Sequence, residues 1–288
     1  MGDLIMAKTG LILEGGAIRG IYSAGVLDYL LDANQHFDYV IGVSAGCGNA
    51  ANFVAKQRGR SKKVITHEGM ESFWGARSFK NSHKFLNLDI LVDQYALEDA
   101  RFDFDTFYHS DTDMECIAID CETGEARYFE KPYEDDARLL LVSKASCAVP
   151  YACKPVEIDG RYYLDGSLAD SIPVERAIEK GCDKLLVVMT RPESKGATNY
   201  SKVKRITNKF YGKQFPKLCE TMEKRSENYQ KQLEHLHALE KEGKAFIMCP
   251  EKTIGHFEKD ADKVEAFYRF GYISMKNRYE EFLEFLER

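Results

Sequence analysis

The chain has 288 residues, of which 44% are hydrophobic and 30% charged, and its formal net charge is −6. This composition predicts a globular chain with one large or two modest domains and gives no case for nucleic-acid binding. No apolar run approaches the roughly 20 residues that cross a bilayer, and residues 1–9 lack the regions of a secretory signal. We therefore expect a cytoplasmic protein.

Eight cysteines occur without a C-x-x-C pair or a regular framework, at positions 47, 116, 121, 147, 153, 182, 219 and 249. We interpret them as reduced thiols in a cytoplasmic protein. A zinc site is the alternative, but we expect neither a metal nor another cofactor.

The chain begins with a β-α-β unit. A short strand at 9–14 leads into a glycine loop at 15–20, an amphipathic helix at 21–33 and a second strand at 37–43. The two strands should be parallel and adjacent with a right-handed crossover. Their C-terminal ends then meet at the edge where open α/β sheets place their active sites.

The second strand runs into the turn Gly42-Val43-Ser44-Ala45-Gly46. Gly-x-Ser-x-Gly is typical of a nucleophile turn, where a strand reverses into a helix, here expected at about 47–57, and a strained serine exposes its hydroxyl. Gly42 and Gly46 lack the Cβ that would collide in so tight a crossing. The alternative is a glycine-rich turn with an ordinary serine.

The glycine loop Gly15-Gly16-Ala17-Ile18-Arg19-Gly20 has two interpretations. It nearly matches a dinucleotide-binding fingerprint, but that fold requires an acidic residue at the end of the second strand. Asp38 precedes that strand and Ser44 ends it. We favour an oxyanion hole formed by the backbone N–H groups of Gly15, Gly16 and Ala17, with a simple tight turn as the other alternative.

Residues 64–110 are aromatic-rich and irregular, and we expect either a mobile cap over an acyl site or a loop-and-helix segment packed on the core. The preceding helix is expected to end at the basic stretch 58–63. We interpret this stretch either as a solvated helix terminus or as a phosphate-binding site. His67, His83 and His109 have no ligand spacing and are expected at the surface.

The middle of the chain contains two predicted hairpins, separated by a helix at 135–146. The first joins 114–120 to 126–130, and the second spans 156–164 with its turn at Asp159-Gly160. Asp165-Gly166 then marks the exit from a strand. A helix beginning near Pro173 and a buried, parallel strand at 184–190 follow.

The last third is predicted to be helix-rich, with a long helix at 220–242, a strand at 245–249 and one or two helices at 260–288. Residues 194–219 contain no acidic residue and carry seven lysines or arginines among aromatic residues. This segment predicts either a patch for anionic lipid headgroups or a solvated face.

A histidine base is difficult to place. His235 and His237 are two residues apart on a helix and point to different faces, whereas His256 follows Gly255 and could be positioned. However, the nucleophile of α/β-hydrolases follows several strands, and Ser44 follows one, so that fold fits poorly.

The glycine loop, the turn at Ser44 and Asp165-Gly166 together resemble the patatin-like phospholipase family. The resemblance covers about residues 10–190 and includes the stretches 145–150 and 172–174. It implies a three-layer α/β/α fold with a mainly parallel central sheet, a catalytic core at 8–192 and a helix-rich extension at 193–288 packed on the same domain. Residues 195–288 match loosely, and no function is carried over to them.

The resemblance also implies a Ser-Asp dyad without histidine, with Ser44 as nucleophile and Asp165 as base. Arg19, Gly20, Gly42, Gly46 and Gly166 would support the motifs, and Ala17 stands where many members have a third glycine. An exposed aspartate with a pKa of about 3.9 is a weak base, so we expect partial burial to raise the pKa of Asp165.

The sequence therefore predicts a serine hydrolase of lipid acyl esters that contacts a membrane, if at all, peripherally. A short-chain esterase or thioesterase with the same dyad, and a nucleotide-binding module using the glycine loop, are the alternatives. The third alternative is a patatin-like scaffold that acts mainly by binding membranes through residues 195–217.

Overall fold

The structure is a computed structural model that describes residues 7–66, 73–82 and 85–288. The predictions for His67 and His83, and parts of the predicted 64–110 segment, lie outside these residues. Within them, no helix is both long enough and apolar enough to cross a membrane.

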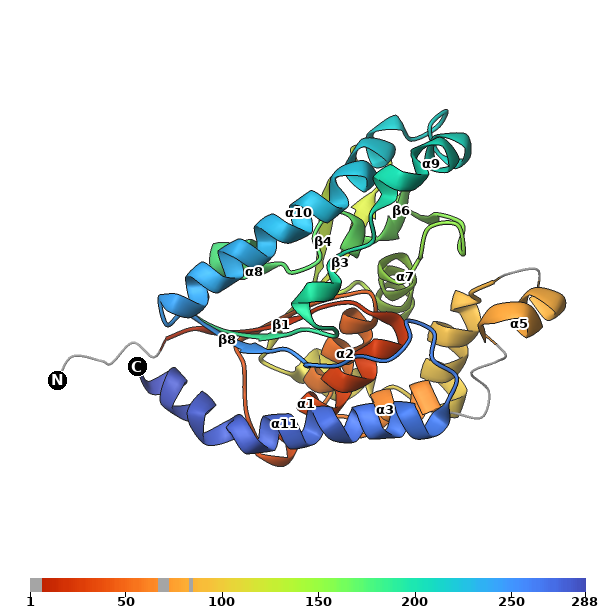
Figure 1. The fold of residues 1–288 in the computed structure, drawn as a ribbon. Coiled ribbons are helices and arrows are strands. Elements are labelled where there is room, and N and C mark those ends of the chain that lie inside the picture. The colour runs from red at the N-terminus through yellow and green to blue at the C-terminus, as the bar shows by residue number, and fades with distance from the viewer. Residues whose placement is uncertain (1–6, 67–72, 83–84) are drawn as a thin grey trace.

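An eight-stranded sheet forms the centre of the described chain (Figure 1). Its strands are β1 (Thr9–Leu13), β2 (Tyr39–Val43), β3 (Asp113–Asp120), β4 (Ala126–Glu130), β5 (Val156–Ile158), β6 (Arg161–Asp165), β7 (Lys184–Val188) and β8 (Ala245–Met248). They follow the order β5-β6-β3-β2-β1-β7-β8, and β4 pairs with β3. The run from β3 through β2, β1 and β7 to β8 is parallel, whereas β4, β5 and β6 join by antiparallel pairing.

Helices cover both faces of this sheet. Its central strands are buried on both faces, which is why they appear in the sequence as continuous apolar runs. The main helices are α1 (Gly20–Asp32), α2 (Ala45–Val54), α7 (Asp136–Ser146), α8 (Val174–Glu179), α10 (Pro216–Lys241) and α11 (Ala261–Glu287). The apolar residues of α8 and of the second half of α10 join one core cluster, and those of α1, α2, α7 and α11 join another. These layers confirm the predicted three-layer α/β/α fold with a mainly parallel sheet.

The segment at 64–110 is largely helical where it is described and packs on the core, which agrees with the loop-and-helix alternative and not with an irregular segment. It contains α3 (Arg60–Thr66), α5 (Gly75–Ser82), the π-helix Asp89–Asp99 and α6 (Phe104–His109). The aromatic side chains that obscured a helical pattern pack against one another and against the core, as Phe73 does on Tyr95 at 6.0 Å between ring centroids.

Cys47 and Cys116 form a disulfide between α2 and β3, so the prediction of eight reduced thiols is wrong for this pair. The two cysteines are 69 residues apart and belong to no motif, so only the fold brings them together. The other six, all within the described residues, form no disulfide. Cys47 and Cys116 therefore no longer support the inference of a cytoplasmic location, which assumed that these thiols are reduced.

The last third of the chain packs directly on the first. Strand β8 extends the sheet beside β7, and α11 lies against α1. The two helices cross at glycines, because a Cβ on Gly25 would lie 2.1 Å from the Tyr268 carbonyl oxygen. A Cβ on Gly271 would lie 2.1 Å from the carbonyl oxygen of Tyr22.

Candidate active site

Ser44 occupies the sharp turn between β2 and α2. Its backbone has φ 56° and ψ −125°, a conformation that is strained for any residue with a Cβ. The turn is tight enough that a Cβ on Gly42 would lie 2.2 Å from the Gly46 carbonyl oxygen, and one on Gly46 would lie 2.3 Å from that of Leu13. These contacts explain the two glycines of the Gly-x-Ser-x-Gly pattern.

Asp165 ends β6 and lies beside Ser44. The Ser44 side chain lies close enough to this carboxylate to lower its pKa, and the N–H of Ser167 donates to Oδ1 at 2.9 Å. The Asp165 side chain is 4% exposed, and desolvation raises the pKa of Asp165 above the usual aspartate range despite these contacts. Burial therefore makes this carboxylate a stronger base than an exposed aspartate.

The last residue of α7 and the loop that follows it hold both residues in place. The Ser44 N–H donates to the Ser146 hydroxyl at 2.9 Å, and the Asp165 N–H donates to the Ala148 carbonyl oxygen at 2.9 Å. Cys147, between them, contacts the Ser44 side chain. Burial and the charge of Asp165 raise the pKa of this thiol, so it is a neutral neighbour at pH 7.

The glycine loop lies next to the serine. A Cβ on Gly15 would lie 3.0 Å from the Cβ of Ser44. The N–H groups of Gly15, Gly16 and Ala17 donate to no acceptor in the described part of the chain, whereas that of Ile18 donates to the His256 carbonyl oxygen at 3.2 Å. Three donors thus remain unused beside Ser44.

The other motif positions support these two loops. Arg19 ends the short 3-10 turn within the glycine loop, and Gly20 begins α1 against Ala45. Gly166 begins the 3-10 turn that follows Asp165.

A buried network that the sequence did not predict supports the glycine loop. Glu14, 1% exposed, accepts hydrogen bonds from the Thr190 N–H at 2.8 Å and the Tyr229 hydroxyl at 2.9 Å. It also forms an ion pair with Arg191 at 3.0 Å. The Thr190 hydroxyl lies 2.8 Å from the Gly15 carbonyl oxygen. The segment that follows β7 and helix α10 thereby fix the position of the loop.

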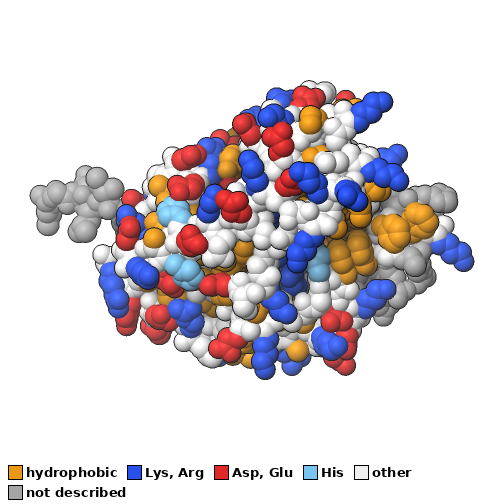
Figure 2. Space-filling view, turned by 45° about the horizontal axis from the view of Figure 1, so that its top comes forward, with side chains coloured by type: hydrophobic (Ala, Val, Ile, Leu, Met, Phe, Trp, Pro, Cys, Tyr) orange, Lys and Arg blue, Asp and Glu red, His pale blue; other side chains and the backbone are white. Residues whose placement is uncertain are grey.

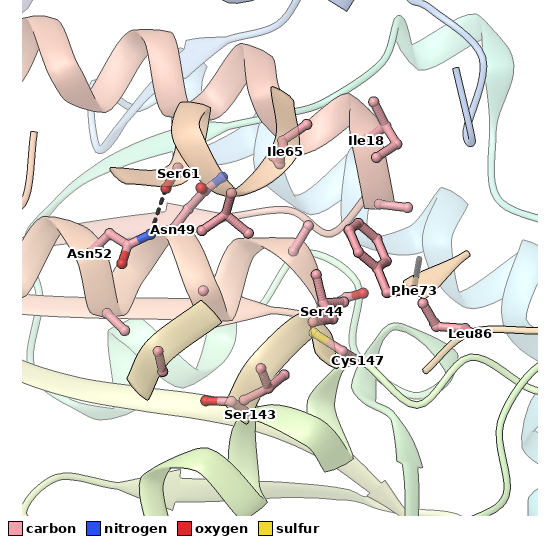
Figure 3. Close-up of a pocket in the computed structure, with 18 of the residues that line it drawn as sticks. Ile18, Ser44, Asn49, Asn52, Ser61, Ile65, Phe73, Leu86, Ser143 and Cys147 are labelled. Carbon is pink, nitrogen blue, oxygen red and sulfur yellow. Dashed lines mark hydrogen bonds between the residues drawn. The ribbon is translucent and has the colours of Figure 1, made fainter. Parts of the chain in front are cut away.

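An apolar cavity opens on one side of Ser44 (Figure 3). Its volume is about 180 Å³, and its walls come from the glycine loop, from α2 and α3, from α7 and the loop after it, from residues 73–102 and from Phe257. Figure 3 shows Ser44 near Cys147, Phe73 and Leu86 at one end, and Asn52 and Ser61 further along. The apolar side chains from 73–102 that line it are Phe73, Trp74, Leu86, Leu91, Val92, Ala96 and Phe102.

A smaller polar cavity of about 70 Å³ also reaches Ser44. Asp165 lines it together with Arg19, Arg191, Arg225 and His256. On the face shown in Figure 2, blue Lys and Arg side chains lie beside a histidine and a group of hydrophobic side chains. The positively charged residues of this cavity come from both ends of the chain.

Most residues that line this polar cavity were not predicted from the sequence. Arg225 is one of many charged residues on α10, and its helical spacing gave no indication that it faces inward. His256 was considered as a base, but it contacts Arg19 with Nδ1 at 2.6 Å from the guanidinium rather than orienting Ser44. His235 lies instead beside Glu175, and His237 beside Glu193.

Comparison with known proteins identifies two regions. Residues 11–178 match the family described as patatin-like phospholipase, and residues 215–287 match a domain of unknown function, DUF6363. The first match covers more than half of the chain.

Among curated relatives, the chain is 31% identical over 198 residues to the uncharacterized protein YjjU of Escherichia coli, covering 64% of this chain and 52% of that protein. It is 27% identical over 177 residues to a cGAMP-activated phospholipase of Pseudomonas aeruginosa, covering 57% and 53%. It is 25% identical over 192 residues to lysophospholipase nte1 of Aspergillus terreus, covering 63% and 12%. The chain thus spans about half the length of the bacterial relatives and much less of the fungal one.

Among solved structures, VipD from Legionella pneumophila matches with a TM-score of 0.51 and 12% identity, covering 98% of this chain and 67% of VipD. At this identity the likeness concerns the fold alone.

Proposed function

Because the chain belongs to the patatin-like phospholipase family, we propose that it is a serine hydrolase that cleaves carboxylic esters of lipids with Ser44 and Asp165. The observation that carries the proposal is the contact between a serine in a strained turn and a buried carboxylate with a raised pKa. The cGAMP-activated phospholipase and lysophospholipase among the relatives agree with a lipid ester as substrate.

In the proposed first step, the Ser44 oxygen attacks the ester carbonyl carbon and its proton passes to Asp165. The N–H groups of Gly15, Gly16 and Ala17, which have no other described acceptor, would donate to the developing oxyanion. The tetrahedral intermediate then collapses, and Asp165 returns the proton to the departing alcohol oxygen.

In the second step, water hydrolyses the acyl-enzyme with Asp165 again as the base. The mechanism uses these residues alone to move protons, since His256 contacts Arg19 instead of Ser44. The Glu14 network would act on this chemistry indirectly, by holding the glycine loop against Ser44.

The apolar cavity supports a long acyl chain as the group transferred to Ser44. Its lining is mainly apolar and begins at the nucleophile, so each methylene that enters it leaves water. The short-chain esterase and the thioesterase would use the same dyad and differ only in the acyl group or the leaving atom.

The experiment that tests the proposal is labelling with a fluorophosphonate, read by intact mass and peptide mapping. We expect one adduct, on Ser44, in the wild type and none in Ser44→Ala. A profile of p-nitrophenyl esters from two to sixteen carbons should then rise with chain length. A folded protein that remains unlabelled in detergent and with liposomes would reject a hydrolase, and a maximum at the shortest esters would favour the short-chain alternative.

A further inference from the structure

The polar cavity is a feature that the reaction described above does not require. It meets the apolar cavity at Ser44 and Val149, which line both. A substrate with its ester at Ser44 and its acyl chain in the apolar cavity can therefore place its alcohol portion in the polar one.

Two of the three arginines in this cavity have no carboxylate partner. Arg191 is paired with Glu14. Arg225, 9% exposed, donates to the carbonyl oxygen of Ser167 at 2.7 Å and to its hydroxyl at 3.1 Å. Arg19 contacts the Gly16 carbonyl oxygen at 3.4 Å and His256. No carboxylate of residues 7–66, 73–82 or 85–288 forms an ion pair with Arg19 or Arg225.

The cations of the cavity also act on one another. Desolvation and the charge of Arg191 lower the pKa of Arg19 to about 10. Desolvation, and then the charges of Arg19, Arg191 and Arg225, lower the pKa of His256 to about 4. The imidazole is therefore neutral at pH 7, and because Nδ1 accepts from Arg19, Nε2 is its N–H donor.

Arg225 is buried and Arg19 is half-buried, and a desolvated cation that forms no ion pair is stabilised when an anion binds to it. We propose that this cavity is a phosphate subsite beside Ser44, built from Arg19 of the glycine loop and from Arg225 and His256 of the C-terminal third. Guanidinium groups bind phosphate oxygens with paired, charge-assisted hydrogen bonds, and two unpaired guanidinium groups match the charge of a phosphate monoester.

The same cavity offers little to a positively charged headgroup. Of its two acidic residues in the described chain, Glu14 is occupied by Arg191, Tyr229 and Thr190, and Asp165 serves as the proposed base. An ammonium group would thus meet arginines without a free carboxylate. We infer a preference for a phosphate monoester over a phosphate that carries an amine.

The phosphate can come from the headgroup of a lipid substrate or from free phosphate that binds as an effector. The headgroup source rests on the proposed hydrolase function, whereas binding of the anion does not. Two measurements separate these questions, one of binding and one of substrate preference.

The binding measurement uses Ser44→Ala, which needs no turnover, and titrates it calorimetrically with inorganic phosphate and with glycerol 3-phosphate. We expect a Kd of about 1 mM or tighter, weakened about 10- to 100-fold when Arg225→Gln is added. Lys224→Gln is the matched control, because Lys224 is the exposed neighbour of Arg225 on α10 and loses the same charge.

The preference measurement compares hydrolysis of a lysophosphatidic acid with that of a monoacylglycerol of the same acyl chain. We expect Arg225→Gln to lower the ratio of the two kcat/KM values about 10- to 100-fold, Arg225→Lys to lower it less, and Lys224→Gln to leave it unchanged. Equal losses on both substrates would mean that Arg225 acts only by positioning Asp165 through Ser167.

Each combination of results has a meaning. A fall in the ratio assigns the site to the lipid headgroup, and Arg225-dependent phosphate binding with an unchanged ratio assigns it to free phosphate. An unchanged ratio together with no Arg225-dependent binding of phosphate or glycerol 3-phosphate overturns the subsite. If the wild type hydrolyses neither substrate and takes no fluorophosphonate, the proposed hydrolase fails, and the Ser44→Ala titration alone decides the subsite.

Discussion

Ser44 carries both the proposed chemistry and the backbone strain of the turn. Its φ of 56° and ψ of −125° are accessible to glycine but unfavourable for residues with a Cβ. The fold keeps this strain because the turn holds the hydroxyl beside Asp165 and the glycine loop. A strained residue at the proposed nucleophile is therefore evidence about function as well as about conformation.

The strain predicts a difference between two inactive variants. Ser44→Gly and Ser44→Ala both lose the nucleophile, but only glycine relieves the positive φ. We expect Ser44→Gly to be more stable than Ser44→Ala by about 1–2 kcal/mol, measured by urea unfolding at equilibrium. A less stable glycine variant would show that the backbone at this position is not strained.

Asp165 predicts a pH dependence whose sign follows from its burial. Desolvation raises its pKa in the folded protein, and the base must be ionised. The kcat/KM for ester hydrolysis should therefore rise with pH along an acidic limb centred above about 3.9, the usual value for aspartate. Asp165→Asn should lower kcat about 10²- to 10⁴-fold.

The raised pKa of Asp165 makes the free energy of unfolding fall as pH rises, whereas it makes kcat/KM increase. Because the folded protein holds the Asp165 proton more tightly than the unfolded chain, its stabilising effect is complete at low pH and is lost as pH rises through the folded pKa. At pH 7 Asp165→Asn should thus melt no lower than the wild type. A variant that keeps most of its turnover, or melts well below the wild type, would contradict this account of Asp165.

At the residue scale, sequence identified the parts of the site that belong to short motifs. Ser44, Asp165 and the glycine loop are each marked by glycines whose spacing reflects a close backbone approach, and the structure brings them together. Arg225, Tyr229 and Glu14 belong to no glycine motif, so no short pattern in the sequence indicates their roles. Their contacts depend on where α10 crosses the sheet, which no local pattern encodes.

At the scale of elements, the strands within residues 9–188 were predictable, because each shows a hydrophobic periodicity or a turn signal in the sequence. The hairpin of β3 and β4 and the parallel β1, β2 and β7 are confirmed. The segment with α5 and the π-helix was not, because its aromatic residues pack on several sides. The crossing of α1 and α11 was also hidden, since Gly25 and Gly271 are single glycines within ordinary helical sequences.

That crossing predicts a large effect from one methyl group. Gly271→Ala would place a Cβ 2.1 Å from the Tyr22 carbonyl oxygen, so the helices must separate. We expect a loss of about 1–3 kcal/mol in the free energy of unfolding. Gly48→Ala in α2 is the matched control, because its Cβ would meet nothing within 4 Å, and it should be neutral or stabilising. Equal effects of the two substitutions would contradict the close crossing.

At the scale of the whole molecule, the acid-free segment 194–219 lies next to the polar cavity. Thr198 and Tyr200 line that cavity, and helix α9 (Lys204–Phe210) follows them. Val203, Ile206 and Phe210 are exposed at helical spacing, by 36%, 51% and 63%. Lys204 and Lys217 pair with Glu223 and Glu220, but Lys202, Arg205, Lys209 and Lys213 form no ion pair with the described residues.

Exposed apolar residues beside unpaired cations are typical of a helix that lies in a membrane interface. We therefore expect α9 to bind anionic membranes and to bring the polar cavity close to the lipid surface. Vesicle flotation with phosphatidylglycerol and phosphatidylcholine should show binding that weakens as NaCl rises to about 0.5 M. Ile206→Ser combined with Phe210→Ser should weaken it about five- to twentyfold.

The structure offers a matched control for this surface. Ile273 on α11 is exposed by 51%, the same fraction as Ile206. Figure 1 places α11 along the side of the molecule away from α9. Because the two substitutions remove equal exposed apolar groups, Ile206→Ser should weaken binding while Ile273→Ser leaves it unchanged. Equal losses would mean that binding depends on total surface hydrophobicity, and retention of binding by the α9 variants would exclude α9 as the membrane contact.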